Sequence, residues 1–303
     1  SVCKNNLASI LSGTVTGPTT TGIWSGGSGT FNPGSSVLNS TYTPSAAELT
    51  AGVVTLTLTS TANGNCNAVT DVMQITLTNA PTVSAGSDVN SCKNNANTVL
   101  SGVISGPTTT GSWIGGTGSF NPGNSALTST YTPSAAELTA GVVTLTLTST
   151  NNGNCNAVTD VVQINFTAAP NANAGTDISS CKNNPAVTLA GNVSGATTTG
   201  AWSGGTGTFN PNNSTLNTIY TPSAAELTAG SVTLTLASTG NGNCIASTDN
   251  VIINFTNPPV VNAGLDLSVC KNNLASILSG TVSGPTTSGI WSGGSGTFNP
   301  GSS

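Results

Sequence analysis

The chain of 303 residues contains no His, a single Met and few aromatic or charged side chains. Charged residues make up 4% of it, whereas an ordinary soluble domain has about 25%. All cations are Lys residues at equivalent positions: Lys4, Lys93, Lys182 and Lys271. Because proteins that bind nucleic acid use clusters of basic side chains to neutralise phosphates, the sequence excludes that class.

Other absences exclude further classes. Without His, a unique nucleophile with a base, or a loop that could cradle phosphate, the sequence predicts no enzyme and no cofactor. The seven cysteines show neither a C-x-x-C pair nor the spacing of a zinc module, so we predict no metal ion. No stretch approaches the ~20 apolar residues that span a bilayer, and no signal peptide is recognisable.

What the sequence does contain is an array of near-copies with a period of 89 residues. The first cysteine of each copy recurs at Cys3, Cys92, Cys181 and Cys270. A repeated feature favours a property exercised many times along the chain over a single active site. Ser268–Ser303 repeats Ser1–Ser36 with two substitutions, Thr16 to Ser283 and Thr21 to Ser288, so we expect a window from a longer polymer.

The period predicts four repeats: 1–80, which lacks its first strand, 81–169, 170–257, and the truncated N-terminal part of a fourth repeat at 258–303. Val, Ile and Thr alternate in runs that Gly, Asn and Pro separate, which is the composition of strands and turns. In the second repeat we expect strands at Thr82–Ser91, Thr98–Ile104, Gly111–Ile114, Ser119–Phe120, Ser125–Thr132, Val142–Thr148 and Asn156–Thr167.

Two local signals support this division. Ser134-Ala135-Ala136-Glu137 is a capping-box pattern followed by a stop at Gly141, which predicts one helical turn between two strands. Asn152-Gly153 is typical of a β-hairpin turn. About seven short strands in ~89 residues indicate an all-β fold of tandem immunoglobulin-like β-sandwich domains arranged end to end in an extended rod.

Four strings recur in every complete repeat: Ala-Gly-x-Asp-x-x-x-Cys, Trp-x-Gly-Gly-x-Gly-x-Phe-x-Pro, Tyr-Thr-Pro-Ser-Ala-Ala-Glu-Leu-Thr-Ala-Gly and Gly-Asn-Cys. Over the whole chain this pattern resembles the immunoglobulin-like or PKD-like repeats of giant Bacteroidota surface adhesins. It looks most like SprB-type gliding-motility proteins, which the type IX secretion system exports and which are displayed as filaments. The resemblance implies a surface filament and does not indicate a ligand.

The cysteines suggest an oxidising, extracellular setting. We considered two pairings. Pairing across linkers, Cys66–Cys92, Cys155–Cys181 and Cys244–Cys270, places the sulfurs about a domain length apart, which exceeds the Cα separation of ~6 Å that a disulfide allows. We therefore favour pairing within repeats: Cys3–Cys66, Cys92–Cys155 and Cys181–Cys244, with the partner of Cys270 past the end of the chain.

The aromatic residues of the motifs are candidates for the core. We expect the tryptophans to pack on the disulfides, as in immunoglobulin domains, although exposed rings in Gly-rich segments could stack on sugars. The predicted core residues are Trp24, Trp113, Trp202, Tyr42, Tyr131 and Tyr220.

The repeated acids offer a weaker alternative chemistry. They could hydrolyse glycosides or bind calcium at repeat junctions, but no two of them are close in sequence. Capping and turn roles are favoured. The acids are Glu48, Glu137, Glu226, Asp71, Asp160, Asp249, Asp88, Asp177 and Asp266.

Two further motifs have unremarkable interpretations. Lys4 and its copies fit loop residues better than partners in an isopeptide bond, and the Thr-x-Thr rows fit half-exposed strands better than an ice-binding face. The sequence thus predicts the disulfide-stabilised stalk of an extracellular, cell-surface filament or adhesin that serves gliding motility or surface attachment. The alternative is a multivalent carbohydrate-binding array with one weak site per repeat. Predicted partners are neighbouring repeats, surface polysaccharide or other filament chains.

Overall fold

The structure is a computed structural model that describes residues 1–7 and 9–301. It is all-β and divides into two compact units, Ser1–Thr167 and Ala168–Ser303. The first unit covers the first two predicted repeats up to Thr167, and the second unit begins with Ala168 and Ala169 and covers the third and fourth predicted repeats. Ser302 and Ser303 of the predicted fourth repeat lie outside the described residues.

The second repeat has the most complete set of elements. They are β8 (Thr82–Ser84), β9 (Val89–Cys92), β10 (Thr98–Ser101), β11 (Val103–Ser105), β12 (Thr110–Ile114), β13 (Ser119–Asn121), β14 (Thr128–Thr132), α2 (Ala135–Ala140), β15 (Val142–Thr150) and β16 (Thr159–Thr167). One sheet has the order β12-β15-β16-β9, and the other layer contains the sheet β10-β14-β13 and the pair β11-β8. This is an immunoglobulin-like sandwich, with β9 parallel to β16.

The core of this sandwich lies between the two layers. In β15 the buried residues Val143, Leu145 and Leu147 alternate with Thr side chains, as the sequence predicts for a strand with one face in the core. They pack in one cluster with residues of the opposite layer, such as Leu100 and Tyr131. The 89-residue repeat therefore encloses its own core.

Two predicted strands are each split in the structure. The expected strand Thr82–Ser91 is interrupted at Gly86, whose φ of 88° separates β8 from β9, and the two halves join different layers. The expected strand Thr98–Ile104 is interrupted at Gly102, where an added Cβ would lie 3.0 Å from Cζ2 of Trp113. The first break occurs because the chain passes from one sheet to the other at Gly86. The second occurs because the backbone at Gly102 lies against the buried ring of Trp113.

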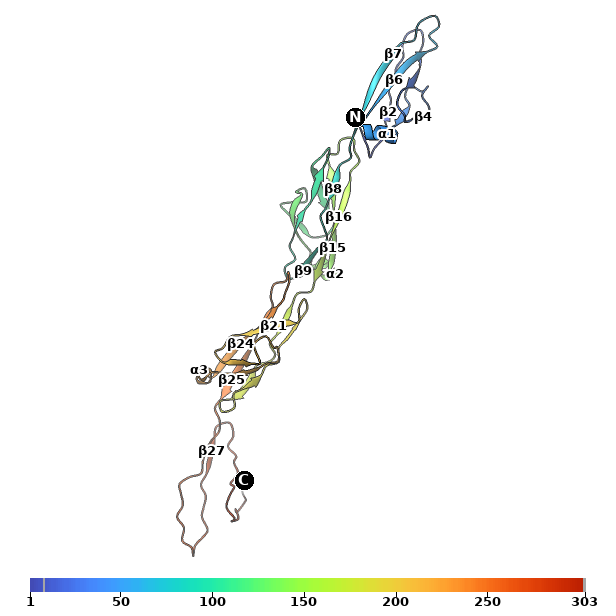
Figure 1. The fold of residues 1–303 in the computed structure, drawn as a ribbon. Coiled ribbons are helices and arrows are strands. Elements are labelled where there is room, and N and C mark those ends of the chain that lie inside the picture. Colours follow the sequence, from blue (N-terminus) through green and yellow to red (C-terminus); the bar gives the residue numbers. More distant parts are fainter. Residues whose placement is uncertain (8, 302–303) are drawn as a thin grey trace. The chain divides into compact units, whose positions relative to one another are not determined.

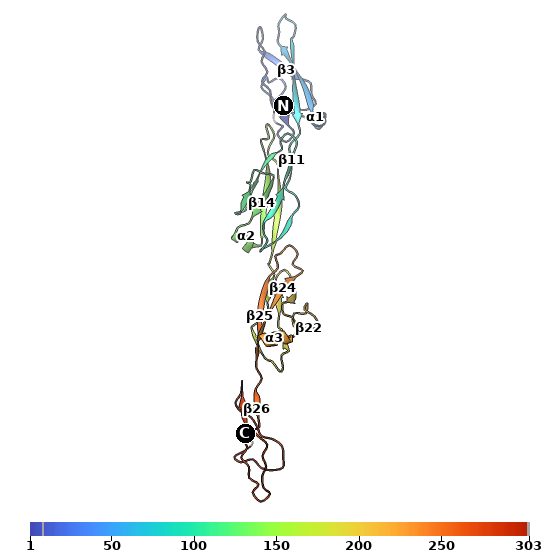
Figure 2. The same ribbon diagram turned by 90° about the vertical axis from the view of Figure 1, so that its left-hand side faces the viewer.

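The predicted helical turn is confirmed as α2. Its N-cap Ser134 accepts a hydrogen bond from the Glu137 N–H, and the Glu137 carboxylate accepts one from the Ser134 N–H, which completes the capping box. Gly141 ends the helix with a φ of 83°. In Figure 2, α2 follows β14 at one end of the second sandwich.

The first and third repeats have the same architecture. The first contains β1 (Val2–Cys3), β2 (Ser9–Ile10), β3 (Thr21–Ser25), β4 (Thr30–Asn32), β5 (Thr41–Thr43), α1 (Ala46–Ala51), β6 (Val53–Thr61) and β7 (Thr70–Thr78). The third contains β17 (Asn171–Asn173), β18 (Ile178–Cys181), β19 (Val187–Thr188), β20 (Asn192–Ser194), β21 (Thr199–Ser203), β22 (Thr208–Asn210), β23 (Ile219–Thr221), α3 (Ala224–Ala229), β24 (Ser231–Thr239) and β25 (Thr248–Thr256). Among its described residues, the first repeat has no counterpart of the pair β8 and β11 or of the pair β17 and β20.

The fourth repeat contains far less regular structure. Within its described residues the strands are β26 (Val260–Asn262) and β27 (Thr281–Ser283), which pair with each other antiparallel. The sequence contains no counterpart of the strands β14 to β16 for this repeat. Several of its large apolar side chains are exposed, among them Leu265, Ile277 and Ile290.

Candidate functional site: a disulfide clamp between two repeats

The first half of the clamp is the Cys-Lys-Asn-Asn segment that begins at Cys3. Strand β1 runs parallel to β7, and Cys3 pairs in register with Thr78 at the end of β7. The backbone N–H of Lys4 continues this pairing with a hydrogen bond of 2.9 Å to the carbonyl of Thr78. A tight turn follows, in which the Asn6 N–H donates to the Cys3 carbonyl. The segment is thereby fixed at the end of the first sandwich where the chain leaves for the second.

The second half of the clamp is the hairpin loop Asn152–Asn156, which joins β15 to β16. The Cys155 N–H donates to the Asn152 carbonyl at 3.0 Å, and the Asn152 side-chain amide donates to the carbonyl of Ser149 at 3.0 Å. Gly153 has a φ of 58°, the left-handed conformation that favours glycine. The predicted Asn-Gly turn therefore presents Cys155 at the tip of the hairpin.

Cys3 and Cys155 form a disulfide between the first and second repeats, with a Cα–Cα distance of 4.9 Å. Both cysteines are buried. Figures 1 and 2 show the N-terminus at the end of the first sandwich that meets the second, near β8 and β11. The bond connects positions that are 152 residues apart in sequence.

Five hydrogen bonds between the same two segments surround the disulfide. Asn156 donates from its backbone N–H to Oδ1 of Asn5 at 3.0 Å and from its side-chain amide to the Asn5 carbonyl at 2.7 Å. The Asn5 amide donates in return to the Asn156 carbonyl at 3.0 Å. Asn6 and Asn154 complete the set, donating to the carbonyls of Asn154 and Ser1 respectively. The asparagines thus form hydrogen bonds with the backbone of the opposite segment. The two repeats are joined by these polar contacts as well as by the covalent bond.

This arrangement overturns the predicted pairing within repeats. Cys66 and Cys181 are free, so Cys3–Cys66 and Cys181–Cys244 do not form, and Cys155 bonds to Cys3 rather than to Cys92. Cys92 and Cys244 are each disulfide-bonded. Cys270, the remaining cysteine, is free and exposed.

The physical reason is the parallel pairing of β9 with β16. Cys92 lies opposite Thr167, at one end of β16, whereas Cys155 precedes the other end at Thr159. At about 3.3 Å per residue these ends are about 26 Å apart, far beyond the reach of a disulfide. Sequence spacing alone did not reveal that the two cysteines of one repeat lie at opposite ends of its sandwich.

The predicted core tryptophans lie in the sandwiches, away from this disulfide. Trp113 is fully buried, pairs in register with Leu147 and donates from Nε1 to the carbonyl of Leu127 at 3.2 Å. Trp202 and Trp24 make the equivalent bonds. Neither Cys92 nor Cys155 belongs to the cluster around Trp113, so the expectation that the rings pack on disulfides is wrong. The buried rings of Trp24, Trp113 and Trp202 are not available for stacking on a sugar.

The predicted core tyrosines form a second polar network, which composition did not reveal. Tyr131 is fully buried, donates to Oε1 of Glu137 at 2.7 Å and accepts from the Gly118 N–H. Glu137 also accepts from the Thr117 N–H at 2.7 Å. The carboxylate therefore caps α2 and anchors the Gly-rich loop at once. Tyr42 and Tyr220 repeat the network with Glu48 and Glu226.

Burial and hydrogen bonding shift the titration of both groups. Burial and the hydrogen bond to Glu137 raise the pKa of Tyr131 to about 12. Burial also raises the pKa of the Glu137 carboxyl, but the N–H groups of Ser134 and Thr117 and the Tyr131 hydroxyl outweigh it and hold that pKa below its ordinary value. The network therefore contains a charged Glu137 carboxylate and a neutral Tyr131 phenol.

The aspartates of the second and third repeats accept hydrogen bonds from backbone N–H groups. Asp160 accepts from the Ala85 N–H at 2.8 Å, and Asp88 accepts from the Gln163 N–H at 2.9 Å, so together they tie the crossing from β8 to β9 against β16. Asp249 and Asp177 do the same in the third repeat. Among the described residues no group of His, Cys, Asp and Glu is arranged to hold a metal ion.

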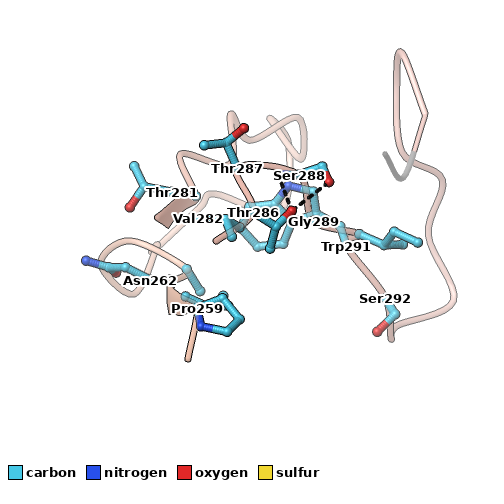
Figure 3. A pocket seen from close by; sticks show the side chains of 14 residues that line it. Pro259, Asn262, Thr281, Val282, Thr286, Thr287, Ser288, Gly289, Trp291 and Ser292 are labelled. Carbon is cyan, nitrogen blue, oxygen red and sulfur yellow. Dashed lines mark hydrogen bonds between the residues drawn. The ribbon is translucent and has the colours of Figure 1, made fainter. Parts of the chain in front are cut away.

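A hollow of about 610 Å³ lies in the fourth repeat (Figure 3). Its lining includes Pro259, Asn262, Val282 and Trp291, and Trp291 is only half-buried. In the second repeat the equivalent ring is covered by Leu145 and Leu147 of β15, which have no counterpart here. The hollow is the uncovered half of a sandwich core.

No protein-family model matches the chain, and no curated protein matches its sequence. Extracellular cadherin domains 3–6 of protocadherin gamma B2 align with a TM-score of 0.33 at 14% identity, over 89% of this chain and 74% of that chain. Mouse cadherin-23 EC22–24 gives 0.32 at 12%, over 85% and 96%.

Immunoglobulin domains 1–5 of Sidekick-1 align with a TM-score of 0.34 at 12% identity, over 93% of this chain and 64% of that chain. Because these scores are low, the assignment of immunoglobulin-like sandwiches rests on the strand order and cores of the chain itself. Within the part of the chain that the structure describes, no helix has both the length and the apolar character needed to cross a membrane.

Proposed function

We propose that the chain is a structural segment, a stalk, of an extracellular filament or adhesin whose successive repeats are joined covalently. The clamp between Cys3 and Cys155, with its five hydrogen bonds, is the observation that carries this proposal. A structural role needs no side chains that occur only once. This agrees with sequence motifs that recur in every complete repeat. The repeat boundaries proposed from sequence, 1–80, 81–169, 170–257 and 258–303, are part of this interpretation.

The extracellular location follows from disulfide chemistry. Disulfides persist in oxidising compartments and are rare where glutathione and thioredoxin keep thiols reduced. The finer assignment, a SprB-type filament exported by type IX secretion for gliding or surface attachment, is supported by the resemblance of the repeat motifs. We propose a non-enzymatic role without cofactors, with neighbouring repeats as partners.

The clamp gives the stalk a specific mechanical property. Tension applied at Ser1 passes through the Cys3–Cys155 bond. Cys92, inside the loop that this bond closes, is itself disulfide-bonded, so the part of the loop that is bypassed and carries no load is the part between Cys3 and Cys92. Unfolding of that part then cannot lengthen the molecule. A disulfide that encloses nearly two domains limits extension in a way that a disulfide within one domain does not.

Single-molecule stretching of the chain between its two ends tests this property. In oxidised protein the residues between Cys3 and Cys92 should contribute nothing to the extension. Reduction should release at least these roughly 90 residues, which lengthens the fully extended chain by at least about 300 Å, at about 3.4 Å per residue. Equal contour lengths before and after reduction would refute the covalent stalk.

A carbohydrate-binding array is not favoured. Such an array needs an aromatic platform in each repeat, and the rings of Trp113 and Trp202 have no exposed surface. These rings therefore offer no contact surface to a surface polysaccharide or to another filament chain.

A further inference from the structure

Three hydroxyl-bearing residues in a row form a surface loop in every repeat. They are Thr19–Thr21, Thr108–Thr110 and Thr197–Thr199, and the fourth repeat has Thr286-Thr287-Ser288. In the first three repeats the last threonine of the triplet is the first residue of β3, β12 or β21. The clamp and the tyrosine network use other residues, so these triplets have no role in the stalk as described above.

The two outer threonines of each triplet fix the loop. The Thr108 hydroxyl donates to the carbonyl of Thr150 at 2.7 Å and accepts from the Thr110 N–H at 3.2 Å. The Thr110 hydroxyl donates to the same carbonyl at 3.0 Å. The first repeat makes the same three bonds with Thr61 as the acceptor. The outer hydroxyls are thus engaged with the backbone, and they order the loop.

The middle threonine is placed differently. Thr20, Thr109 and Thr198 lie outside the strands and are exposed. Figure 3 shows the corresponding loop of the fourth repeat, in which dashed lines join Thr286 to Ser288 and do not involve Thr287. Each repeat therefore presents one exposed threonine hydroxyl on an ordered loop that its neighbours hold in place.

The surface of the chain also lacks the usual source of solubility. Charged residues are 4% of the chain, whereas roughly 25–35% of the surface of a soluble domain is charged. Large apolar side chains are nevertheless exposed in each of the first three repeats, among them Ile10, Val99 and Ile219. A surface of this kind promotes association unless another hydrated group covers it.

We propose that Thr20, Thr109, Thr198 and Thr287 are attachment sites for O-linked glycans, which give the chain the hydration that its charges do not supply. Extracellular stalks rich in Ser, Thr and Pro are typical carriers of such glycans, and a proline precedes the triplet at Pro18, Pro107 and Pro285. Glycans are bulky and solubilise a surface. The proposal goes beyond the proposed function: it rests on the extracellular location and does not depend on the clamp.

N-linked glycans fit the repeats less well. Their acceptor, Asn-x-Ser/Thr, occurs at Asn39, but the equivalent positions hold Thr128 and Asn217, and Asn217 is followed by Thr218 and Ile219. No such acceptor recurs at one position in all of the first three repeats, whereas the middle threonine recurs in every repeat. The repeated site is therefore the hydroxyl.

The modification is a group transfer that a separate glycosyltransferase would catalyse. The co-substrate is a sugar activated at its anomeric carbon by a phosphate ester. The threonine Oγ1 attacks that carbon, the bond from the carbon to the phosphate oxygen breaks, and the phosphate leaves with the electron pair. A base of the transferase takes the hydroxyl proton, so the products are the glycosylated threonine and the free phosphate-bearing carrier.

The experiment uses the whole chain isolated from the cells that display it. Peptides are mapped by mass spectrometry with a fragmentation method that keeps sugars on their side chains. We expect one glycan on each middle threonine, and mild alkali should release it by β-elimination. Thr109→Val should remove the glycan from the second repeat alone, and the fold should persist because the neighbouring hydroxyls hold the loop.

Thr144 supplies the matched control, because it is also exposed but lies within β15. Thr144→Val should leave the glycan mass unchanged. Bare middle threonines, sugars confined to asparagines, or a glycan mass that does not respond to Thr109→Val would each overturn the proposal. A bare chain that still lengthens on reduction would overturn it while leaving the covalent stalk intact.

A solubility measurement tests the role of the glycans. The chain with all four middle threonines replaced by Val should precipitate at a lower ammonium sulfate concentration than the glycosylated parent. The same replacements in a chain produced in cells without the transferase should shift that concentration far less. Equal shifts in the two backgrounds would show that the added valines cause the effect, and would refute hydration by glycans.

Discussion

The first 36 residues and their near-copy at the end of the chain have almost the same sequence but different structures. Residues 1–32 contain β1, β2, β3 and β4. In the described part of the copy, the residues equivalent to these strands contain none, and the strand present is β27, which has no counterpart in the first repeat. Nearly identical sequences therefore form different strands in the two places.

The available strand partners explain the difference. β1 and β3 pair with β7 and β6, and β2 and β4 pair with β5, all of which come later in the first repeat. β27 pairs with β26, which precedes the copy. A strand forms only where its hydrogen-bonding groups find a neighbour, so each copy uses the partners its own surroundings supply.

Burial follows the same division. Leu11 is fully buried, whereas the equivalent Leu278 is 43% exposed. One local contact survives in both places: a Cβ on Gly13 would lie 2.8 Å from Cζ2 of Trp24, and one on Gly280 would lie 2.7 Å from Cζ2 of Trp291. The Trp-on-glycine contact is thus local, while the exclusion of water depends on the strands that follow.

Completing the fourth repeat should have the largest effect. A chain that continues past Ser303 with a copy of residues 37–80 supplies counterparts of β5, β6 and β7. We expect Trp291 to become as buried as Trp24, which is 6% exposed, and the residues equivalent to β3 to gain protection from hydrogen exchange. Fluorescence of Trp291, with the other tryptophans replaced by Phe, measures the change. An unchanged emission maximum would show that partner strands are not what the copy lacks.

Replacing a tryptophan by Ala should have a smaller effect, and the loss of stability should differ between the closed second repeat and the open fourth repeat. Trp113→Ala should cost about 3–5 kcal/mol in the free energy of unfolding of the second repeat, because it leaves a cavity in a closed core. Trp291→Ala, the matched variant in the open fragment, should change stability little. Denaturant unfolding monitored by circular dichroism compares them. Equal losses would contradict the view that the fourth repeat lacks a closed core.

Removing the clamp tests what holds β1 in place. Cys155→Ser should lower the free energy of unfolding of residues 1–167 by about 2–4 kcal/mol, with Cys66→Ser as the control that leaves it unchanged. Because β1 is also paired with β7, the amide of Lys4 should keep most of its protection from exchange. Complete loss of that protection would mean that the clamp, and not β7, orders the strand.

Alkaline titration should affect the complete repeats alone. The pKa of Tyr131 is raised to about 12, so its contribution to stability is complete below pH 10, where the unfolded state begins to lose the proton. It should decline by about 2 kcal/mol as the pH rises toward 12. Calorimetry at several pH values measures the slope, and Tyr131→Phe should reduce it. A slope unaffected by that substitution would exclude the phenol as its source.

Acid titration should give the smallest effect, with the opposite sign. The folded pKa of the Glu137 carboxyl lies below the unfolded value of 4.5, so its contribution is present above that value and is lost as the pH falls through the folded pKa. Glu137→Gln should flatten the decline in melting temperature below pH 4.5. If the variant keeps the full decline, other carboxylates are responsible.

The sequence by itself determined the local structure of this protein. The alternation of Val143, Leu145 and Leu147 with Thr predicts β15, and the capping box from Ser134 to Glu137 predicts α2, because each signal depends on residues close together in the chain. The 89-residue period likewise predicts repeated sandwiches with aromatic residues in their motifs.

Tertiary structure alone decided which residues cover these elements and which cysteines pair. Whether Trp24 or Trp291 is covered depends on strands dozens of residues away. The partner of Cys155 is Cys3 of another repeat, because the parallel pairing of β9 with β16 sends the two cysteines of one repeat to opposite ends of its sandwich. Spacing in sequence records how far apart two cysteines are along the chain, but only the register of the strands decides which two sulfurs meet.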